Sequence, residues 1–176
     1  MGFRLMGGLA RNSNAPSIQI SAADSQNWTM QSRNFQDDTF YGLGVSFSGA
    51  SRFSFELAGM YFNREILYTA YSENETDPAL QTQARTQPLQ VIHLPAQLRM
   101  KMGRFISFSL GGYYDYSLSS WYDYDLGLTA GARIRVPIKG ALGIYAEGVY
   151  NYGLVDFAEV GPTQQTMFVF GVSWRD

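Results

Sequence analysis

The sequence predicts an all-β fold: an eight-stranded antiparallel up-and-down transmembrane β-barrel that takes up residues 1–176 as a single domain. Three observations predict it. Apolar residues alternate with small or polar ones along most of the chain, Gly and aromatic residues are abundant, and long links alternate with short ones. The 18 Gly, 12 Tyr and 12 Phe fit such a fold, whereas the absence of Cys excludes a disulfide framework and thiolate chemistry. A net charge of -2 argues against a nucleic-acid partner.

Eight segments alternate with the period of a β-strand. They are residues 2–10, 39–48, 53–69, 87–101, 106–118, 124–135, 142–154 and 166–176. In the first four, the apolar face carries Phe3, Leu5 and Leu9; Tyr41, Leu43, Val45 and Phe47; Phe53, Phe55, Leu57 and Tyr61; then Ile92, Leu94, Leu98 and Met100. In the last four, it carries Ile106, Phe108, Leu110, Tyr114 and Tyr116; Leu126, Leu128 and Ile134; Ile144, Tyr150, Tyr152 and Leu154; then Phe168, Phe170, Val172 and Trp174.

The opposite face of these segments is rich in Gly, Ser, Ala and Thr, with scattered charges. Eight strands enclose too little room for so many aromatic side chains, whereas small polar residues fit the interior. The aromatic face is therefore predicted to point outward. A surface of this kind would aggregate in water but is stable in lipid. No run of about 18 apolar residues occurs, so the chain is expected to cross the membrane with strands alone.

The links between the segments predict the orientation. Residues 49–52, 102–105 and 136–141 form short links, and residues 11–38, 70–86 and 155–165 form long ones; only 119–123 is short on the long side. Barrels of the outer membrane have short periplasmic turns and longer extracellular loops, so both termini are expected in the periplasm. The first residues lack the regions of a signal peptide, so the chain is either cytoplasmic or a mature form whose leader is replaced by Met1, and with a predicted barrel we expect the second.

Two stretches resemble a known family. They are IHLPAQLRMKMGRFISFSLGGYYDYSL (92–118) and YDLGLTAGARIRVPIKGALGIYAEGVYNYGL (124–154). Both resemble the small outer-membrane barrels called PorT-like, which are related in architecture to OmpX-type barrels. The resemblance implies a location in the bacterial outer membrane and specifies the fold better than an activity. The terminal strand also looks like the signal that the barrel-assembly machinery reads.

Inward-facing charges form the main candidate site, a charge network in the lumen. Its predicted members are Arg4, Glu56, Arg99, Lys101, Asp115, Asp125, Arg133, Arg135 and Glu147. Buried charges must be paired or hydrated. We expect the pairs Glu56–Arg99 and Glu147–Arg133 near the short turns. Cations outnumber carboxylates there, so water must complete the pairing or Lys101 and Arg135 must reach the rim. A plug is favoured over a gated pore or ligand cage.

Other candidate residues give weaker evidence for a functional site. His93 is the single histidine, and a catalytic base needs a nucleophile and an orienting carboxylate, which no motif around it supplies. No catalytic, cofactor-binding or metal-binding residue is therefore expected. Pro95 lacks a ladder donor, so a bulge or a water is expected beside it. The acidic run 72–79 is interpreted as a solvated loop, although a cation or partner site is an alternative.

The predicted function is a structural or surface-interaction role through residues 11–38 and 70–86, with no enzymatic activity. Expected partners are outer-membrane lipid and lipopolysaccharide, the barrel-assembly machinery and an extracellular protein; the barrel itself is expected to be a monomer. A narrow pore or small-ligand channel is the alternative, and a lipid-modifying enzyme ranks third.

Overall fold

The computed structural model describes residues 1–14, 18–21, 27–35, 38–48, 52–71, 82–118, 124–155 and 164–174. Its barrel strands are β1 (Gly2–Asn14), β4 (Asp38–Ser48), β5 (Phe53–Tyr71), β6 (Thr82–Met102), β7 (Ile106–Ser117), β8 (Tyr124–Lys139), β9 (Leu142–Gly153) and β10 (Gln164–Trp174). Two further strands are β2 (Ile18–Ser21) and β3 (Asn27–Phe35). No helix in the described part of the chain is long and apolar enough to cross a membrane.

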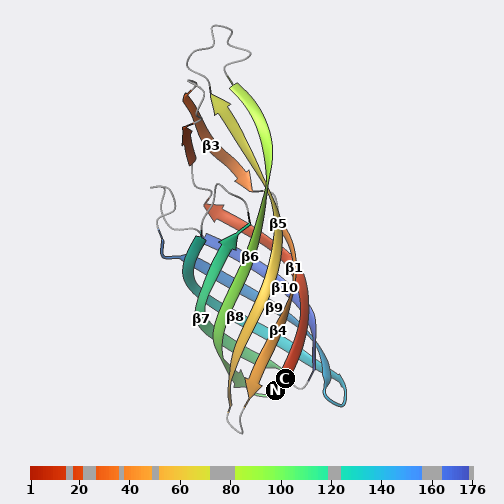
Figure 1. The fold of residues 1–176 in the computed structure, drawn as a ribbon. Coiled ribbons are helices and arrows are strands. Elements are labelled where there is room, and N and C mark those ends of the chain that lie inside the picture. Colours follow the sequence, from red (N-terminus) through yellow and green to blue (C-terminus); the bar gives the residue numbers. More distant parts are fainter. Residues whose placement is uncertain are drawn as a thin grey trace.

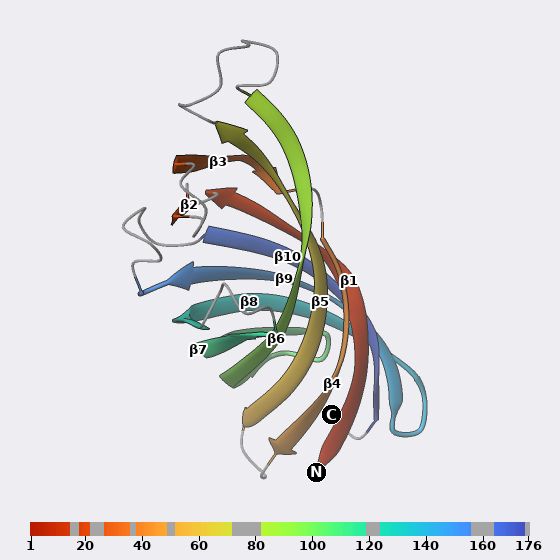
Figure 2. The ribbon, with the colours of Figure 1, turned by 45° about the horizontal axis from the view of Figure 1, so that its top comes forward.

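Eight of these strands close into an antiparallel up-and-down barrel (Figures 1 and 2). Each pairs with its neighbours in the order β4-β1-β10-β9-β8-β7-β6-β5, and β5 also pairs with β4. The first and last barrel strands pair along most of their length, from Phe3 opposite Trp174 to Asn12 opposite Gln165. Because every edge within the barrel is paired, its backbone needs no water to satisfy its hydrogen bonds. The predicted fold class is confirmed.

The barrel faces agree with the predicted alternation. Outward Leu110 is 67% exposed and outward Phe170 is 57% exposed, while inward Ser109 and Val169 are 6% and 3% exposed. Large apolar side chains stand exposed in this way on every barrel strand. A continuous apolar surface of this extent is typical of a barrel whose outside meets lipid.

Aromatic side chains form two groups on the outer surface. Toward the long-loop end, the rings of Tyr41 and Tyr61 lie 5.4 Å apart and those of Tyr114 and Tyr124 lie 6.0 Å apart. At the other end, Trp174 is exposed on the last residue of β10. Two such groups, one at each end, are typical of the aromatic girdles that flank the lipid-facing band of outer-membrane barrels.

Short turns lie at the end of the barrel that also holds both termini (Figure 1). Gly103 and Gly140 occupy these turns with φ values of 81° and 60°, a conformation that residues with a Cβ rarely adopt. The turn between β8 and β9 is shorter than predicted, because β8 continues through Pro137 to Lys139 with a register shift at that point.

The largest error of the sequence-based prediction lies at the opposite end. Residues 11–38 were predicted as a loop, but β2, β3 and the end of β1 lie within them. The link 70–86 is also shorter than predicted, because β6 begins at Thr82 and pairs with β5 up to Tyr71. Strand β3 adds to β5 between Ile66 and Thr69. Apolar residues alternate over only a few positions in β2 and β3, so sequence periodicity did not reveal these strands. The acidic run 72–79 lies outside the described residues.

The expected bulge at Pro95 is absent. Leu57 pairs with Ala96 and Met60 pairs with His93, so the register is the same on both sides of the proline. Only the pairing of the two residues between them is interrupted. The missing proline donor therefore interrupts the ladder between β5 and β6 without displacing the strand.

Candidate functional site: the filled lumen

Glu56 is the centre of the charge network in the half of the lumen near the short turns. Its Oε2 lies 3.0 Å from Nη1 of Arg4 and 2.8 Å from Nε of Arg99. Arg133 donates Nη1 to Oε1 and Nη2 to Oε2, both at 3.1 Å, which is a bidentate arrangement. One carboxylate of β5 thus contacts guanidinium groups from β1, β6 and β8.

Glu147 of β9 is the second acceptor of this network. Arg133 donates Nε and Nη2 to its Oε2 at 3.0 and 2.8 Å, and Nη2 of Arg99 donates to its Oε1. The two predicted pairs, Glu56–Arg99 and Glu147–Arg133, are therefore both present. The prediction treated them as separate pairs between neighbouring strands, whereas Arg99 and Arg133 each bridge both glutamates across the lumen.

All members of this network are at most 7% exposed. Three arginines face two glutamates, so their formal charges sum to one surplus positive charge. Additional neutral groups support the cations: the guanidinium of Arg133 lies 4.6 Å from the ring centre of Tyr145, and Nη1 of Arg99 donates to Ser107 at 3.3 Å. Every charged side chain of the network thus has at least one partner, as buried charges require.

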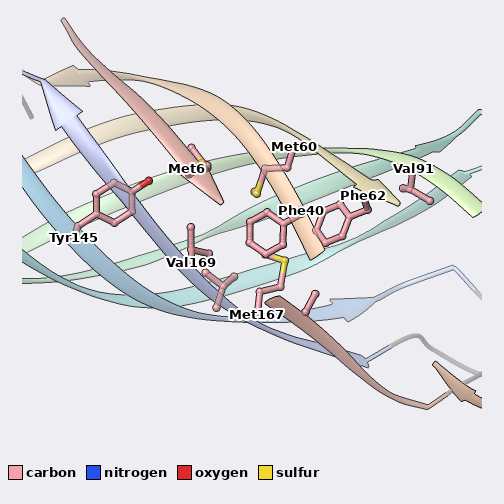
Figure 3. Packing of buried hydrophobic residues seen from close by; sticks show 10 residues of the cluster. Met6, Phe40, Met60, Phe62, Val91, Tyr145, Met167 and Val169 are labelled. Carbon is pink, nitrogen blue, oxygen red and sulfur yellow. The ribbon is translucent and has the colours of Figure 1, made fainter. Parts of the chain in front are cut away.

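An apolar layer lies beyond this network, which the sequence-based prediction of a small, polar interior missed. Figure 3 shows Met6, Phe40, Met60, Phe62 and Met167 pointing toward one another inside the barrel. The rings of Phe40 and Phe62 stack with their centres 4.8 Å apart. Phe40 and Phe62 both occupy positions that alternate with the outward residues of their strands, so the sequence pattern itself predicts that they point inward. The prediction missed them because it assigned aromatic residues in general to the outer face.

Polar pairs occupy the half of the lumen toward the long loops. Nδ1 of His93 is hydrogen-bonded to Asp115, the residue directly opposite it on β7. Tyr113 donates its hydroxyl to Asp125 at 3.0 Å, and Asn151 donates to Gln165 at 3.1 Å. Asp115 is the carboxylate partner of His93 that no local sequence motif indicated, because the two residues meet only through the register of β6 with β7.

His93 itself is fully buried and its ring packs between two aromatic rings, those of Phe62 at 5.8 Å and Tyr113 at 5.0 Å. Its Nε2 is buried and makes no hydrogen bond within the described residues. The described residues also contain no group of three or more His, Asp or Glu side chains that could hold a metal ion. A His–Asp pair is thus in place, without a nucleophilic partner on the other ring nitrogen.

Side chains leave little space between these layers. The cavity between the charge network and the apolar layer has a volume of about 20 Å³ and is lined by Arg4, Glu56, Met60 and Met167 among others. That volume is enough for about one water. Side chains therefore fill the lumen between the charge network and the apolar layer.

The predicted lumen residues divide into three groups. Arg4, Glu56, Arg99, Arg133 and Glu147 form the charge network, and Asp115 and Asp125 belong to the polar pairs of the other half. Lys101 and Arg135 are only half-buried and lie toward the short-turn mouth, where they were expected to reach. Arg135 donates to Ser173 at 2.8 Å and to the carbonyl of Ala141 at 3.2 Å.

Comparison with known proteins gives a match in fold. No family model and no curated protein sequence matches the chain. Among solved structures, the chain is similar to Ail, the attachment invasion locus protein of Yersinia pestis, solved in complex with the heparin analogue sucrose octasulfate. The TM-score is 0.50 at 10% sequence identity, covering 98% of this chain and 97% of Ail. The translocator domain of the autotransporter NalP from Neisseria meningitidis gives a TM-score of 0.46 at 10% identity, covering 100% of this chain and 89% of that chain. At this level of identity, the similarity to Ail supports the barrel fold and carries no activity with it.

Proposed function

We propose that this chain is a monomeric outer-membrane protein of a bacterium whose plugged barrel holds an extracellular β-sheet as a surface-interaction module. The proposal also keeps both termini in the periplasm and assigns the chain no enzymatic activity. Lipid and lipopolysaccharide would surround the barrel, and the barrel-assembly machinery would insert it through β10. The architecture of PorT-like or OmpX-type barrels is the finer form of this proposal.

The main support for this proposed role is that the hairpin of β5 and β6 continues beyond the closed barrel (Figures 1 and 2). Strand β7 pairs with β6 only from Val91 onward, whereas residues 82–90 of β6 pair with β5. Strand β3 adds to β5 in this region and β2 adds to β3. A sheet of four strands thus projects past the rim at the end opposite the short turns.

This sheet has edges that could receive another strand. Among the described strands, residues 82–89 of β6 pair only with β5, and β2 pairs only with β3. Unpaired N–H and C=O groups on an edge strand can recruit an extended segment of a partner by β-augmentation. The similarity to Ail, which is named as an attachment protein, makes attachment to another surface the first kind of interaction to test.

The filled lumen favours this role over the alternative of a pore. The charge network and the apolar layer both cross the lumen, and the cavity between them has a volume of about 20 Å³. A conducting path would require several buried ion pairs to separate together. We therefore expect no steady ion conductance in planar bilayers, and reproducible channels altered by Glu147→Gln would favour the pore instead.

The orientation can be tested by cysteine labelling, because the natural chain contains no Cys. A Gln83→Cys variant places a thiol in the projecting part of β6, and a Lys139→Cys control places one at the end of β8 beside a short turn. On intact cells, a membrane-impermeant maleimide should label the first variant, and it should label the control only after the outer membrane is permeabilised. Labelling of Lys139→Cys on intact cells would overturn the orientation.

The role of the sheet can be tested by shortening the hairpin while keeping the barrel. Residues 67–86 would be replaced by an Asn-Gly turn, which suits a β-hairpin. We expect the shortened protein to keep heat-modifiable mobility in detergent gels but to lose attachment of expressing cells to target-cell or extracellular-matrix surfaces. Unchanged attachment with a folded barrel would contradict the proposed function.

A further inference from the structure

A pocket lined by cationic side chains lies at the short-turn mouth of the barrel, apart from the extracellular sheet. It has a volume of about 110 Å³ and opens between the end of β6, the turn after it, and β8. Its lining includes five cationic side chains: Arg99, Lys101, Arg104, Arg133 and Arg135. The register explains their convergence, because Lys101 pairs with Ser107 and Ser107 pairs with Arg133, all on the inward face.

Within the part of the chain that the structure describes, carboxylates do not balance the charges lining this pocket. Arg99 and Arg133 bind Glu56 and Glu147, but these two glutamates already serve three arginines. Lys101 and Arg104 have no carboxylate within ion-pair distance in the described structure, and the hydrogen bonds of the Arg135 side chain go to the neutral groups of Ser173 and Ala141. Like charges on adjacent strands repel one another, so this cluster would be stabilised by a bound anion.

The volume of the pocket and the residues that line it indicate which class of anion it could bind. A volume of about 110 Å³ is several times that needed for one water, which is room for a phosphate-sized group but not for a large ligand. The pocket is also lined by Phe105 and Ile106, each 46% exposed. Ile106 begins the outward apolar face of β7, so the pocket borders the lipid-facing surface. Cations beside an exposed apolar rim suit a molecule with a charged head and an apolar chain.

We propose that this pocket binds a phosphate-bearing anion, namely the headgroup of an anionic phospholipid in the leaflet at the short-turn end. The phosphate oxygens would accept hydrogen bonds from Lys101, Arg104 and Nη1 of Arg135, and an acyl chain would lie along Phe105 and Ile106. Basic pockets at membrane surfaces commonly select anionic lipids in this way. The inference rests on the membrane placement of the barrel and is independent of the role proposed for the extracellular sheet.

The test uses the full chain folded in an uncharged detergent. Native mass spectrometry and the thermal midpoint of the heat-modifiable band would be followed during titration with phosphatidylglycerol. Phosphatidylcholine with the same chains and inorganic phosphate form two comparison arms. Phosphatidylglycerol should remain bound and raise the midpoint, because a ligand that binds only the folded state stabilises it. Phosphatidylcholine should do neither.

The decisive comparison is between two double variants with the same loss of charge. Lys101→Gln with Arg104→Gln removes two lining cations, while Arg52→Gln with Lys139→Gln removes two exposed cations from the same end of the barrel but outside the pocket. The lining variant should bind phosphatidylglycerol about thirtyfold more weakly, and the control should bind it nearly as the natural chain does. If the lining variant does not fold, Arg104→Gln alone, in an exposed turn, should still weaken binding about fivefold.

Three results would overturn the proposal. Equal binding of phosphatidylcholine would show that the apolar rim acts alone. Equal losses in both double variants would indicate a general charge effect rather than a pocket. Stabilisation by inorganic phosphate as strong as that by the lipid, and lost in the lining variant, would keep the phosphate site but refute the lipid as its ligand. None of these outcomes depends on attachment by the extracellular sheet, so each proposal can fail by itself.

Discussion

The two halves of the lumen are held together in different ways. Near the short turns, Glu56 of β5 contacts Arg133 of β8 and Arg4 of β1, strands that are not its neighbours in the barrel. Toward the long loops, His93–Asp115, Tyr113–Asp125 and Asn151–Gln165 each join strands that are already paired side by side. The first half is tied across its cross-section, and the second is tied mostly around its wall.

This difference predicts different roles in stability. A contact across the lumen holds opposite walls at a fixed distance, so its loss should affect the whole barrel. A contact between neighbouring strands reinforces a ladder that backbone hydrogen bonds already secure, so its loss should remain local. A further bond that skips a strand runs from Gln97 to Thr129 at 3.1 Å and joins β6 to β8 past β7. Gln97 pairs with Glu56, so this bond lies beside the charge network and belongs with the first half.

The strongest test of this comparison is Glu56→Gln. The change leaves Arg4, Arg99 and Arg133 with Glu147 as their remaining carboxylate, and removing one partner of a buried ion pair typically costs about 3–5 kcal/mol. We expect a loss of this size in the free energy of unfolding, measured by urea titration in lipid vesicles with gel mobility as the readout. A loss below about 1 kcal/mol would indicate that water screens the network.

A double change sharpens this first prediction. Glu147→Gln removes one of the two described carboxylates that Arg99 and Arg133 share, and adding Arg133→Met removes one of those two cations. The double variant should recover part of the loss caused by Glu147→Gln. Full recovery is not expected, because Arg133 also binds Glu56. Strict additivity of the two single effects would show that the residues are not coupled.

A second prediction tests whether the inside and outside of the barrel are assigned correctly, on which the comparison of the two lumen halves depends. Leu110 is outward and 67% exposed, and its inward neighbour Ser109 is 6% exposed. Leu110→Arg should cost about 2–4 kcal/mol if the residue lies near the bilayer midplane. In bilayers of different thickness this penalty should change, whereas that of Ser109→Arg, a steric effect, should not. If the costs of Leu110→Arg and Ser109→Arg change equally with bilayer thickness, the assignment of Leu110 to the outside and Ser109 to the inside is wrong.

The sequence predicted the fold more completely than the site, and the residues explain why. Alternation in a strand is a local property, so the outward face of Leu110 and the inward face of Ser109 follow from their neighbours alone. The partners of Arg133 depend instead on the circumference of the closed barrel, which brings β5 opposite β8. Asp115 meets His93 only through the register of two strands. Strands β2 and β3 add to an edge through backbone groups, and the alternation in their sequences is too short to distinguish them from a loop.

A third prediction concerns the half of the lumen toward the long loops. Asp115→Asn keeps the shape of the side chain but removes the negative charge that faces Nδ1 of His93. An amide can still hydrogen-bond one tautomer of the imidazole, so we expect a loss of about 1–3 kcal/mol, smaller than that of Glu56→Gln. Hydrogen exchange should show the faster opening confined to β6 and β7. An increase in exchange around the entire barrel would contradict the distinction between local and cross-lumen contacts.

The smallest effect is expected for Arg4→Met, within the charge network itself. Among the residues that the structure describes, Arg4 has one ion-pair contact, from Nη1 to Glu56 at 3.0 Å, and no hydrogen-bond partner for its buried Nε. Without Arg4, two arginines would face two glutamates, and Glu56 would keep Arg99 and Arg133 as partners. Methionine would also extend the apolar surface of its neighbour Met6 on the same face of β1. Replacing a buried cation that the network does not require should therefore change the free energy of unfolding by less than about 1 kcal/mol, in either direction. The same urea titration would compare the free energy of unfolding of Arg4→Met with that of Glu56→Gln, and Met6→Leu would serve as a control for repacking alone. If Arg4→Met costs as much as Glu56→Gln, the charge of Arg4 is needed for stability, and a further carboxylate must balance it in the folded barrel.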